Sequence, residues 1–178
     1  MADPESREVR TERLLLRPFR SRDADAIARY ANDEEYRRYL SPTHPGVEGF
    51  VAHNVGIDWS VERSWVITFE GEIVGSAFLG INADDNAAEL ACLVARDFWG
   101  MGIGIEASSA AVEHAFLELQ LEKVVARADA RHDASIKVME KLGMRRDGLS
   151  HSHRAGRELR TTDEVIYEVK RAEWFAKR

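Results

Sequence analysis

The sequence predicts a mixed α/β (α+β) fold: a central, mostly antiparallel mixed sheet with helices on both faces. Two observations lead to this prediction. Short apolar stretches typical of strands are interleaved with longer stretches whose apolar residues recur at helical spacing. Three strand-like stretches follow one another in mid-chain, and helical stretches separate the later strands, an order typical of helices on both sides of one sheet. The 178 residues are expected to form one domain over 1–178.

The first half of the chain is expected to hold a strand, a helical region and a hairpin. The expected elements are a strand over 13–19, helices within 23–40 and 47–62, and strands over 64–69 and 72–81. Pro18 and the charged residues after it end the first strand, and the prolines and glycine of 41–46 mark a loop. Glu70-Gly71 is a turn signal between two strands, which predicts the hairpin.

The second half is expected to alternate strands with helices. The expected elements are a strand over 88–94, a helix that ends near 119, a strand over 122–128, a helix over 134–142, and strands over 144–149 and 165–171. The strand over 88–94 is almost entirely apolar, which predicts a central place in the sheet. Asp133 is expected to cap the next helix and Gly143 to end it. The polar stretch 150–162 is expected to be a hairpin loop.

The most informative stretch lies between the strand over 88–94 and the following helix. It reads Trp99, Gly100, Met101, Gly102, Ile103, Gly104 and Ile105, and is called the glycine loop below. Glycine tolerates positive φ, so successive N–H groups can turn inward. A helix that starts here adds its own free N–H groups and the positive end of its dipole. Because no acidic residue lies within this loop, it is predicted to bind a phosphate or pyrophosphate group.

Other glycine-rich phosphate loops fit the spacing less well. A P-loop ends in Gly-Lys-Ser/Thr, which this stretch lacks. A dinucleotide fingerprint needs G-x-G-x-x-G, and its acidic residue would be Glu122, at the start of the next strand rather than at its end. A glycine-rich turn with no ligand would be the better interpretation if the loop stood alone.

The glycine loop with Glu106-Ala107 resembles the coenzyme A loop of the GNAT acetyltransferase superfamily. The RimJ/RimL-type branch resembles it most, with a loop that typically reads Tyr-Trp-Gly-Lys-Gly-Tyr-Ala-Thr-Glu-Ala. The other stretches that carry the resemblance are Thr11–Pro18, Asp133–Met144 against an Asn-x-x-Ser…Glu-Lys-Leu-Gly-Phe helix, and Asp163, Tyr167 and Glu173-Trp174. The expected element order is also that of the GNAT fold, so the resemblance covers nearly the whole chain.

Three positions depart from the family pattern. Met101 stands where the loop commonly has a basic residue, so one phosphate contact is missing. Asp133 is interpreted as the counterpart of the family's Asn, and its charge lies where a phosphate-bearing molecule is expected. Met144 replaces Phe, which is a tolerable apolar change.

The resemblance implies an N-acetyltransferase that uses acetyl-CoA as co-substrate and needs no metal. It would move the acetyl group to a primary amine, either a protein N-terminus or a small molecule. The residues expected at the co-substrate are the main chain of Leu93 and Val94, where the strand splays from its neighbour, the glycine loop, and Asp133. A homodimer is among the assemblies that the resemblance allows. The alternative is a non-catalytic acyl-CoA-binding or sensing domain of the same fold.

Two side chains are candidates for proton transfer. Glu89 is the charged residue of the apolar strand and shares a face with Ala91 and Leu93, so partial desolvation is expected to suit it to act as general base. The alternative is a solvated Glu, or one paired with an Arg. Ser135 shares a helical face with Met139 and is expected to protonate the leaving thiolate; it could equally be a buried hydroxyl bonded to backbone.

Composition narrows the remaining classes of partner, location and site chemistry. The net charge of −6 disfavours a nucleic-acid surface and mildly favours amine substrates. The chain has no apolar run of the roughly 18 residues a membrane helix needs, and its polar N-terminus is not expected to be a signal peptide. Cys92 is the sole cysteine and is expected to be core rather than a nucleophile. His151 and His153 lack an evident third metal ligand. The expected location is the cytoplasm.

Overall fold

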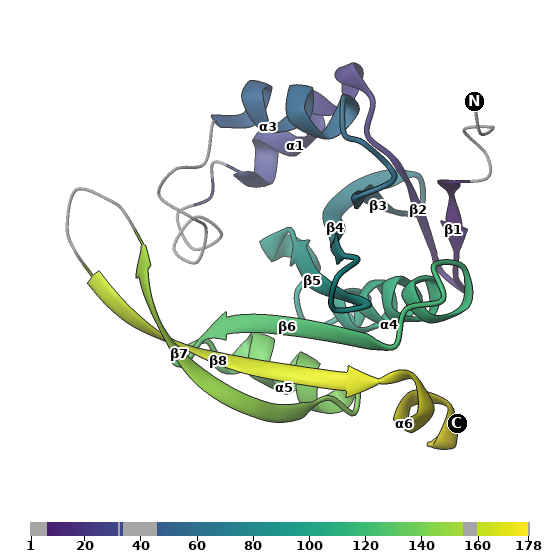
Figure 1. The fold of residues 1–178 in the computed structure, drawn as a ribbon. Coiled ribbons are helices and arrows are strands. Elements are labelled where there is room, and N and C mark those ends of the chain that lie inside the picture. The colour runs from purple at the N-terminus through teal and green to yellow at the C-terminus, as the bar shows by residue number, and fades with distance from the viewer. Residues whose placement is uncertain (1–6, 32, 34–45, 155–159, 178) are drawn as a thin grey trace.

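The structure, a computed structural model, describes residues 7–31, 33, 46–154 and 160–177, of which 150–154 and 160–162 are described in their backbone alone. Its centre is an eight-stranded sheet with the strand order β1-β2-β3-β4-β5-β6-β8-β7 (Figure 1). The strands are β1 Val9–Arg10, β2 Leu14–Pro18, β3 Glu62–Phe69, β4 Glu72–Asn82, β5 Ala87–Val94, β6 Lys123–Asp129, β7 Arg145–Arg154 and β8 Arg160–Lys170. The α-helices are α1 Ala24–Ala31, α3 Gly46–Val55, α4 Ile103–Leu117, α5 Asp133–Lys141 and α6 Arg171–Ala176.

The sheet is mixed but mostly antiparallel, as predicted. Among the paired strands described, β5 and β6 run parallel and every other pair is antiparallel. The apolar strand predicted to be central is β5, which lies between β4 and β6. A parallel pair needs a crossover connection, and α4 supplies it between β5 and β6.

Helices cover both faces of the sheet, which confirms the predicted architecture. On β3, Trp65 and Ile67 pack into the core beneath α4, whereas Val66 between them packs with Phe19 and Ile27 of the α1 side. Successive strand residues point to opposite faces, so α4 and α1 lie on opposite sides. Figure 1 shows α1 and α3 together, separated from α4 and α5 by the sheet.

The first part of the chain departs from prediction in its boundaries. The helix expected over 47–62 ends at Val55, because Gly56 follows and β3 begins at Glu62. The helix expected within 23–40 is α1, which ends at Ala31; residues 34–40 lie outside the described chain. The two-residue strand β1, paired with Leu15 and Leu16, was too short to show a pattern.

The C-terminal hairpin is longer than predicted. The polar stretch 150–162, expected to be a loop, belongs to β7 as far as Arg154 and to β8 from Arg160. Ladder hydrogen bonds join main-chain groups and do not require apolar side chains. The apolar pattern of the sequence therefore indicated only the buried half of this hairpin. The short helix α6 was also missed; Glu173 accepts a hydrogen bond from the Lys170 N–H at its start. No described helix has the length and apolar character to span a membrane.

Candidate active site

The strands β5 and β6 separate at their carboxyl ends. Their parallel ladder joins 87–90 to 123–126 and goes no further. Beyond it, β5 continues to Val94 paired with β4, and the last residues of β6 pair with β8. The edge of β5 that faces β6 is therefore free of ladder pairing at Leu93 and Val94, which confirms the predicted splay.

Gly75 of β4 holds the end of β5 in this position. A Cβ atom on Gly75 would overlap the carbonyl oxygen of Leu93, so β4 and β5 approach more closely than any other residue type would permit. The Ala95 N–H then donates to the Val74 carbonyl at 2.8 Å, which extends the contact past the strand end. Sequence reasoning missed Gly75, because a single glycine within a strand does not reveal which backbone approaches it.

The glycine loop turns directly into α4. Gly100 and Gly102 both have φ near +79°, and Gly102 is the residue at which α4 is capped. The first intrahelical bond runs from the Glu106 N–H to the Gly102 carbonyl at 3.1 Å. The N–H groups of 103–105 therefore have no acceptor within the helix, and they lie at the positive end of its dipole. This geometry fits a phosphate or diphosphate group, as predicted from the glycine spacing.

Trp99 fastens the loop to the end of β5. Its indole N–H donates to the Val94 carbonyl oxygen at 2.7 Å, while the residue stays 46% exposed. On the other side of the loop, a Cβ atom on Gly104 would lie 3.6 Å from the Val94 side chain, so α4 begins in close contact with β5. The loop, the helix start and the free strand edge therefore form one continuous structure.

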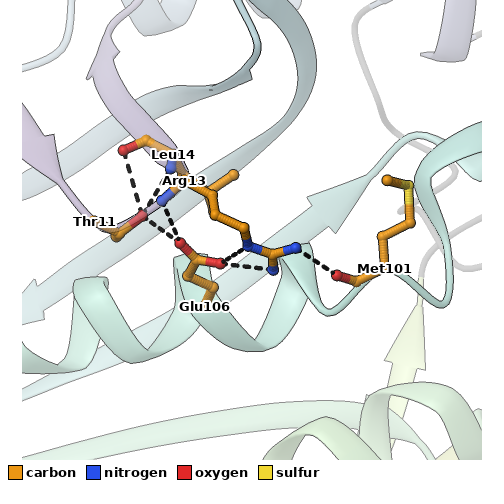
Figure 2. Close-up of polar contacts among 5 residues, drawn as sticks. All are labelled: Thr11, Arg13, Leu14, Met101 and Glu106. Atoms are coloured by element: carbon orange, nitrogen blue, oxygen red, sulfur yellow. Dashed lines mark hydrogen bonds and ion pairs between the residues drawn. The ribbon is translucent and has the colours of Figure 1, made fainter.

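A second set of contacts fastens the loop to the N-terminal segment (Figure 2). Glu106, in the first turn of α4, accepts hydrogen bonds from the Thr11 hydroxyl at 2.5 Å and from the Arg13 N–H at 3.0 Å. The Arg13 guanidinium donates to Glu106 through Nε at 2.7 Å and to the Met101 carbonyl through Nη1 at 3.1 Å. Partial burial alone would raise the pKa of Glu106, but these hydrogen bonds and the charge of Arg13 lower it.

Glu89 lies on the sheet face of Leu93, as predicted, but it is not desolvated. Its side chain is 55% exposed, and Oε1 lies 3.4 Å from Nε of Arg127. Val125, the ladder partner of Glu89, and Arg127 share this face, and the Arg127 side chain is itself 40% exposed. The expectation of partial burial was therefore wrong, and pairing with an Arg is the environment observed.

Ser135 lies near the start of α5, and its partner is a residue that sequence reasoning overlooked. Its hydroxyl oxygen is 2.8 Å from Nδ1 of His132. His132, not Asp133, is the capping position of α5, and no side chain caps the helix; Asp133 is its exposed first residue. The assignment of Asp133 as cap was wrong. In the Asn-x-x-Ser pattern the Asn lies three residues before the Ser. If the Ser is Ser135, the Asn position is His132, so the sequence already contained this signal.

The starts of α4 and α5 lie at the same edge of the sheet. Because β5 and β6 run parallel, the helix that follows each strand begins beyond its carboxyl end. The glycine loop follows β5, and the His132–Ser135 pair follows β6. The separated strand ends thus lie between two groups that can act on one ligand, with hydrogen-bond donors on the β5 side and a hydroxyl–imidazole pair on the β6 side.

The remaining sequence candidates lie elsewhere or outside the described residues. Cys92 is partly buried beneath α4, and burial raises the pKa of its thiol to about 11. The side chains of His151 and His153 lie outside the described residues. Within the described residues, no three His, Cys, Asp or Glu side chains form a metal cluster.

An open groove of about 780 Å³ runs along α4 on its β1 side. Glu113, His114 and Glu118 line it together with Thr11 and Glu106. It is separate from the divergence of β5 and β6, although it reaches the glycine loop at Gly102. We place the candidate site at the separated strands rather than in this groove, because the free main-chain groups lie there.

The fold and the family comparison place this chain among the acetyltransferases. The chain belongs to the GNAT family: the family model of the acetyltransferase (GNAT) domain matches residues 13–145.

Curated relatives and solved structures agree with this assignment. YnaD, an uncharacterized N-acetyltransferase of Bacillus subtilis (strain 168), is 26% identical over 170 residues, which cover 93% of this chain and 98% of YnaD. The spermidine N(1)-acetyltransferase of Escherichia coli (strain K12) is 26% identical over 138 residues, 76% of this chain and 74% of that protein.

Two solved structures share the fold. The acetyltransferase (GNAT family) from Bacillus anthracis superposes with a TM-score of 0.82 at 24% identity, covering 93% of this chain and 99% of that one. Mycobacterium smegmatis RimJ in complex with CoA-disulfide superposes with a TM-score of 0.78 at 23% identity, covering 88% of this chain and 81% of that one.

Proposed function

We propose that this protein is an acetyl-CoA-dependent N-acetyltransferase that acetylates a primary amine by direct transfer. The observation that carries the proposal is the separation of β5 from β6 beside a glycine loop that opens a helix. The free N–H groups of 103–105 would hold the diphosphate of coenzyme A, and the main chain of Leu93 and Val94 would hold its thioester arm. In this scheme, most of the rate acceleration comes from holding the two reactants together in the correct orientation.

The co-substrate supplies an acetyl thioester, whose C–S bond breaks as the amine nitrogen forms the C–N bond. Glu89 takes the proton that the amine nitrogen loses. Four residues of extended strand span about 13 Å, so a thioester held at Leu93 is out of direct reach and the proton travels through ordered water. The carboxylate is exposed to water on this face and lies 3.4 Å from Nε of Arg127.

Ser135 donates its hydroxyl proton to the leaving thiolate. In the tautomer with a proton on Nδ1, His132 donates a hydrogen bond to the Ser135 oxygen. The hydroxyl hydrogen of Ser135 can then point toward the sulfur. His132 then passes its Nδ1 proton to Ser135 while its Nε2 takes up a proton from solvent, so the imidazole stays neutral. We assign His132 as a positioning and proton-relay residue. Asp133, which the sequence predicted at the co-substrate, is the exposed first residue of α5, and its negative charge makes it a poor neighbour for a diphosphate.

Two classes of acceptor fit the proposal: a protein N-terminus and a small amine. The relatives include a spermidine acetyltransferase, and the structural neighbours include RimJ. We propose an amine rather than a nucleic acid, in keeping with the net charge of −6. We further propose one domain over 1–178, no metal in the reaction and a cytoplasmic location. A homodimer is one of the assemblies compatible with this proposal.

The second candidate is a non-catalytic acyl-CoA-binding or sensing domain. The exposed, Arg-paired state of Glu89 favours it, because this carboxylate lacks the burial that the sequence led us to expect of a general base. Release of free thiol from acetyl-CoA with a panel of amines, including spermidine and short peptides, separates the two. Thiol release that depends on an amine supports the transferase, whereas calorimetric binding of CoA without thiol release for any amine supports the sensor.

A further inference from the structure

We infer that Arg13 and Glu106 form a positioning clamp, which orients the glycine loop and neutralises a carboxylate next to the diphosphate site. The inference rests on the proposed binding of coenzyme A. It concerns residues that lie 93 positions apart and that approach one another because β2 runs beside the start of α4. Figure 2 shows Arg13 between the Glu106 side chain and the Met101 carbonyl.

The first step of the argument is main-chain geometry. Arg13 Nη1 donates to the Met101 carbonyl oxygen at 3.1 Å. In a trans peptide the C=O and the next N–H point in opposite directions, so anchoring this carbonyl turns the Gly102 N–H away from Arg13. Gly102 then takes its positive φ of 79° and starts α4. One side chain thereby fixes the orientation of the peptide group on which the helix start depends.

The second step is electrostatic. Glu106 lies in the first turn of α4, where a carboxylate stabilises the helix dipole but repels an anion bound at the same helix end. The carboxylate is 20% exposed, so water screens it only in part. Thr11 and Arg13 engage both of its oxygens, and Arg13 supplies the opposite charge. The clamp makes a local acid compatible with a diphosphate ligand.

The third step concerns the loop itself. The glycine loop, residues 99–105, contains no Lys or Arg, so it has no cation of its own. Arg13 brings a fixed positive charge to the loop from another element. A guanidinium can contact Glu106 and the Met101 carbonyl at once because its donors form a planar fork, whereas a Lys ammonium presents its donors from one atom.

The inference is tested by calorimetric titration of CoA into the full-length parent, Arg13→Met, Glu106→Gln and the double variant. Arg13→Met leaves an unpaired carboxylate and a loose loop, so we expect binding roughly tenfold weaker. Glu106→Gln keeps an acceptor for Arg13 and removes the negative charge, so parent-like or tighter binding is expected. The double variant should bind better than Arg13→Met, and the gap between these two should narrow at high salt.

Arg10→Met is the matched control, because Arg10 lies in the same segment but forms its ion pair with Glu8 rather than with Glu106 or the glycine loop. A second donor adds a readout: acetyl-pantetheine lacks the diphosphate, so Arg13→Met should raise the KM for acetyl-CoA and leave that for acetyl-pantetheine unchanged. If Arg13→Met does not fold, Arg13→Lys replaces it, with binding several-fold weaker expected because one ammonium cannot span both partners.

The outcomes separate the clamp from the proposed function. A parent that fails to bind CoA overturns both. A parent that binds CoA, with Arg13→Met, or Arg13→Lys in its place, binding equally well, overturns the clamp alone. A purely structural brace predicts a lower melting temperature with unchanged affinity per folded molecule, or equal weakening in Arg13→Met, Glu106→Gln and the double variant, and either result would also overturn the inference.

Discussion

The indole N–H of Trp99 donates to the carbonyl oxygen of Val94 at 2.7 Å, so the glycine loop is fastened to the strand end that it follows. Val94 is the last residue of β5 and lies beyond the point where β6 has separated. The bond therefore sets the distance between the main chain proposed to bind the thioester arm and the N–H groups proposed to bind the diphosphate.

Replacing Trp99 with Phe should weaken CoA binding. The ring is kept and one hydrogen bond is lost, which corresponds to roughly a three- to tenfold rise in Kd. Calorimetry with CoA measures the change, and Trp59→Phe is the control because Trp59 packs against Trp65 away from the loop. Equal affinity in Trp99→Phe and the parent would show that the bond does not position the loop.

Gly102→Val should abolish tight CoA binding while the fold survives. A β-branched residue is strained at a φ of 79°, and its side chain would crowd the main chain where a phosphate must approach. We expect a loss of roughly tenfold or more in CoA affinity. The control is Gly148→Val, at a position with a negative or extended φ and open space around a Cβ atom. A variant that binds as tightly as the parent would place the diphosphate elsewhere.

Much of this site is encoded locally, and the rest is not. The glycine loop and the cap at Gly143 depend on short-range backbone conformation, which glycine spacing reports directly. The contact of Arg13 with Glu106 depends on how a strand packs beside a helix 93 residues away, and no local pattern marks it. The exposure of Glu89 likewise depends on which other elements pack over its side of the sheet. Strand periodicity predicts the side on which Glu89 lies, but not what packs there.

Glu89→Gln should reduce kcat on the order of 10²–10⁴-fold, the usual range for a general base. The amide keeps the size of the side chain but cannot take up the amine's proton, and CoA affinity should change little. The loss should shrink as pH rises, because the amine then deprotonates without help. A pH–rate profile normalised to folded protein measures this, and a parent-like profile in Glu89→Gln would remove Glu89 from the mechanism.

Ser135→Ala and His132→Gln should slow the thiol-forming step with little effect on CoA affinity. Loss of the donor should cost roughly 10-fold or more in kcat, and less with acyl donors whose leaving thiol has a lower pKa, since such thiolates need no proton. His132→Gln tests the relay, and Asp133→Asn is the matched control at the neighbouring exposed position. Losses that are equal for good and poor leaving groups would indicate a structural role for the pair.

His114 should make stability depend on pH. Its ring lies edge-on to Trp65 at 5.2 Å, and burial, assisted by the charge of Arg63, lowers the pKa of His114 from 6.5 to about 4. The unfolded chain binds a proton below pH 6.5 that the folded chain refuses until about pH 4, so stability falls as pH drops through this interval. This contribution is on the order of 1 kcal/mol at pH 5, after allowance for partial exposure.

Urea unfolding at pH 7 and pH 5 measures this dependence. His114→Phe keeps a ring against Trp65 and removes the titrating group, so its stability should change less between the two pH values. His53→Gln is the control, since His53 is exposed on α3. An equal pH dependence in the parent and in His114→Phe would show that other groups cause the acid sensitivity.

The central claim is tested most directly by a crystal structure of the protein with acetyl-CoA. We predict that the diphosphate lies against the N–H groups of 103–105 and that the thioester arm runs along the free edge of β5 at Leu93 and Val94. Acetyl-CoA found instead in the groove between β1 and α4, with the separated strand ends empty, would contradict the account.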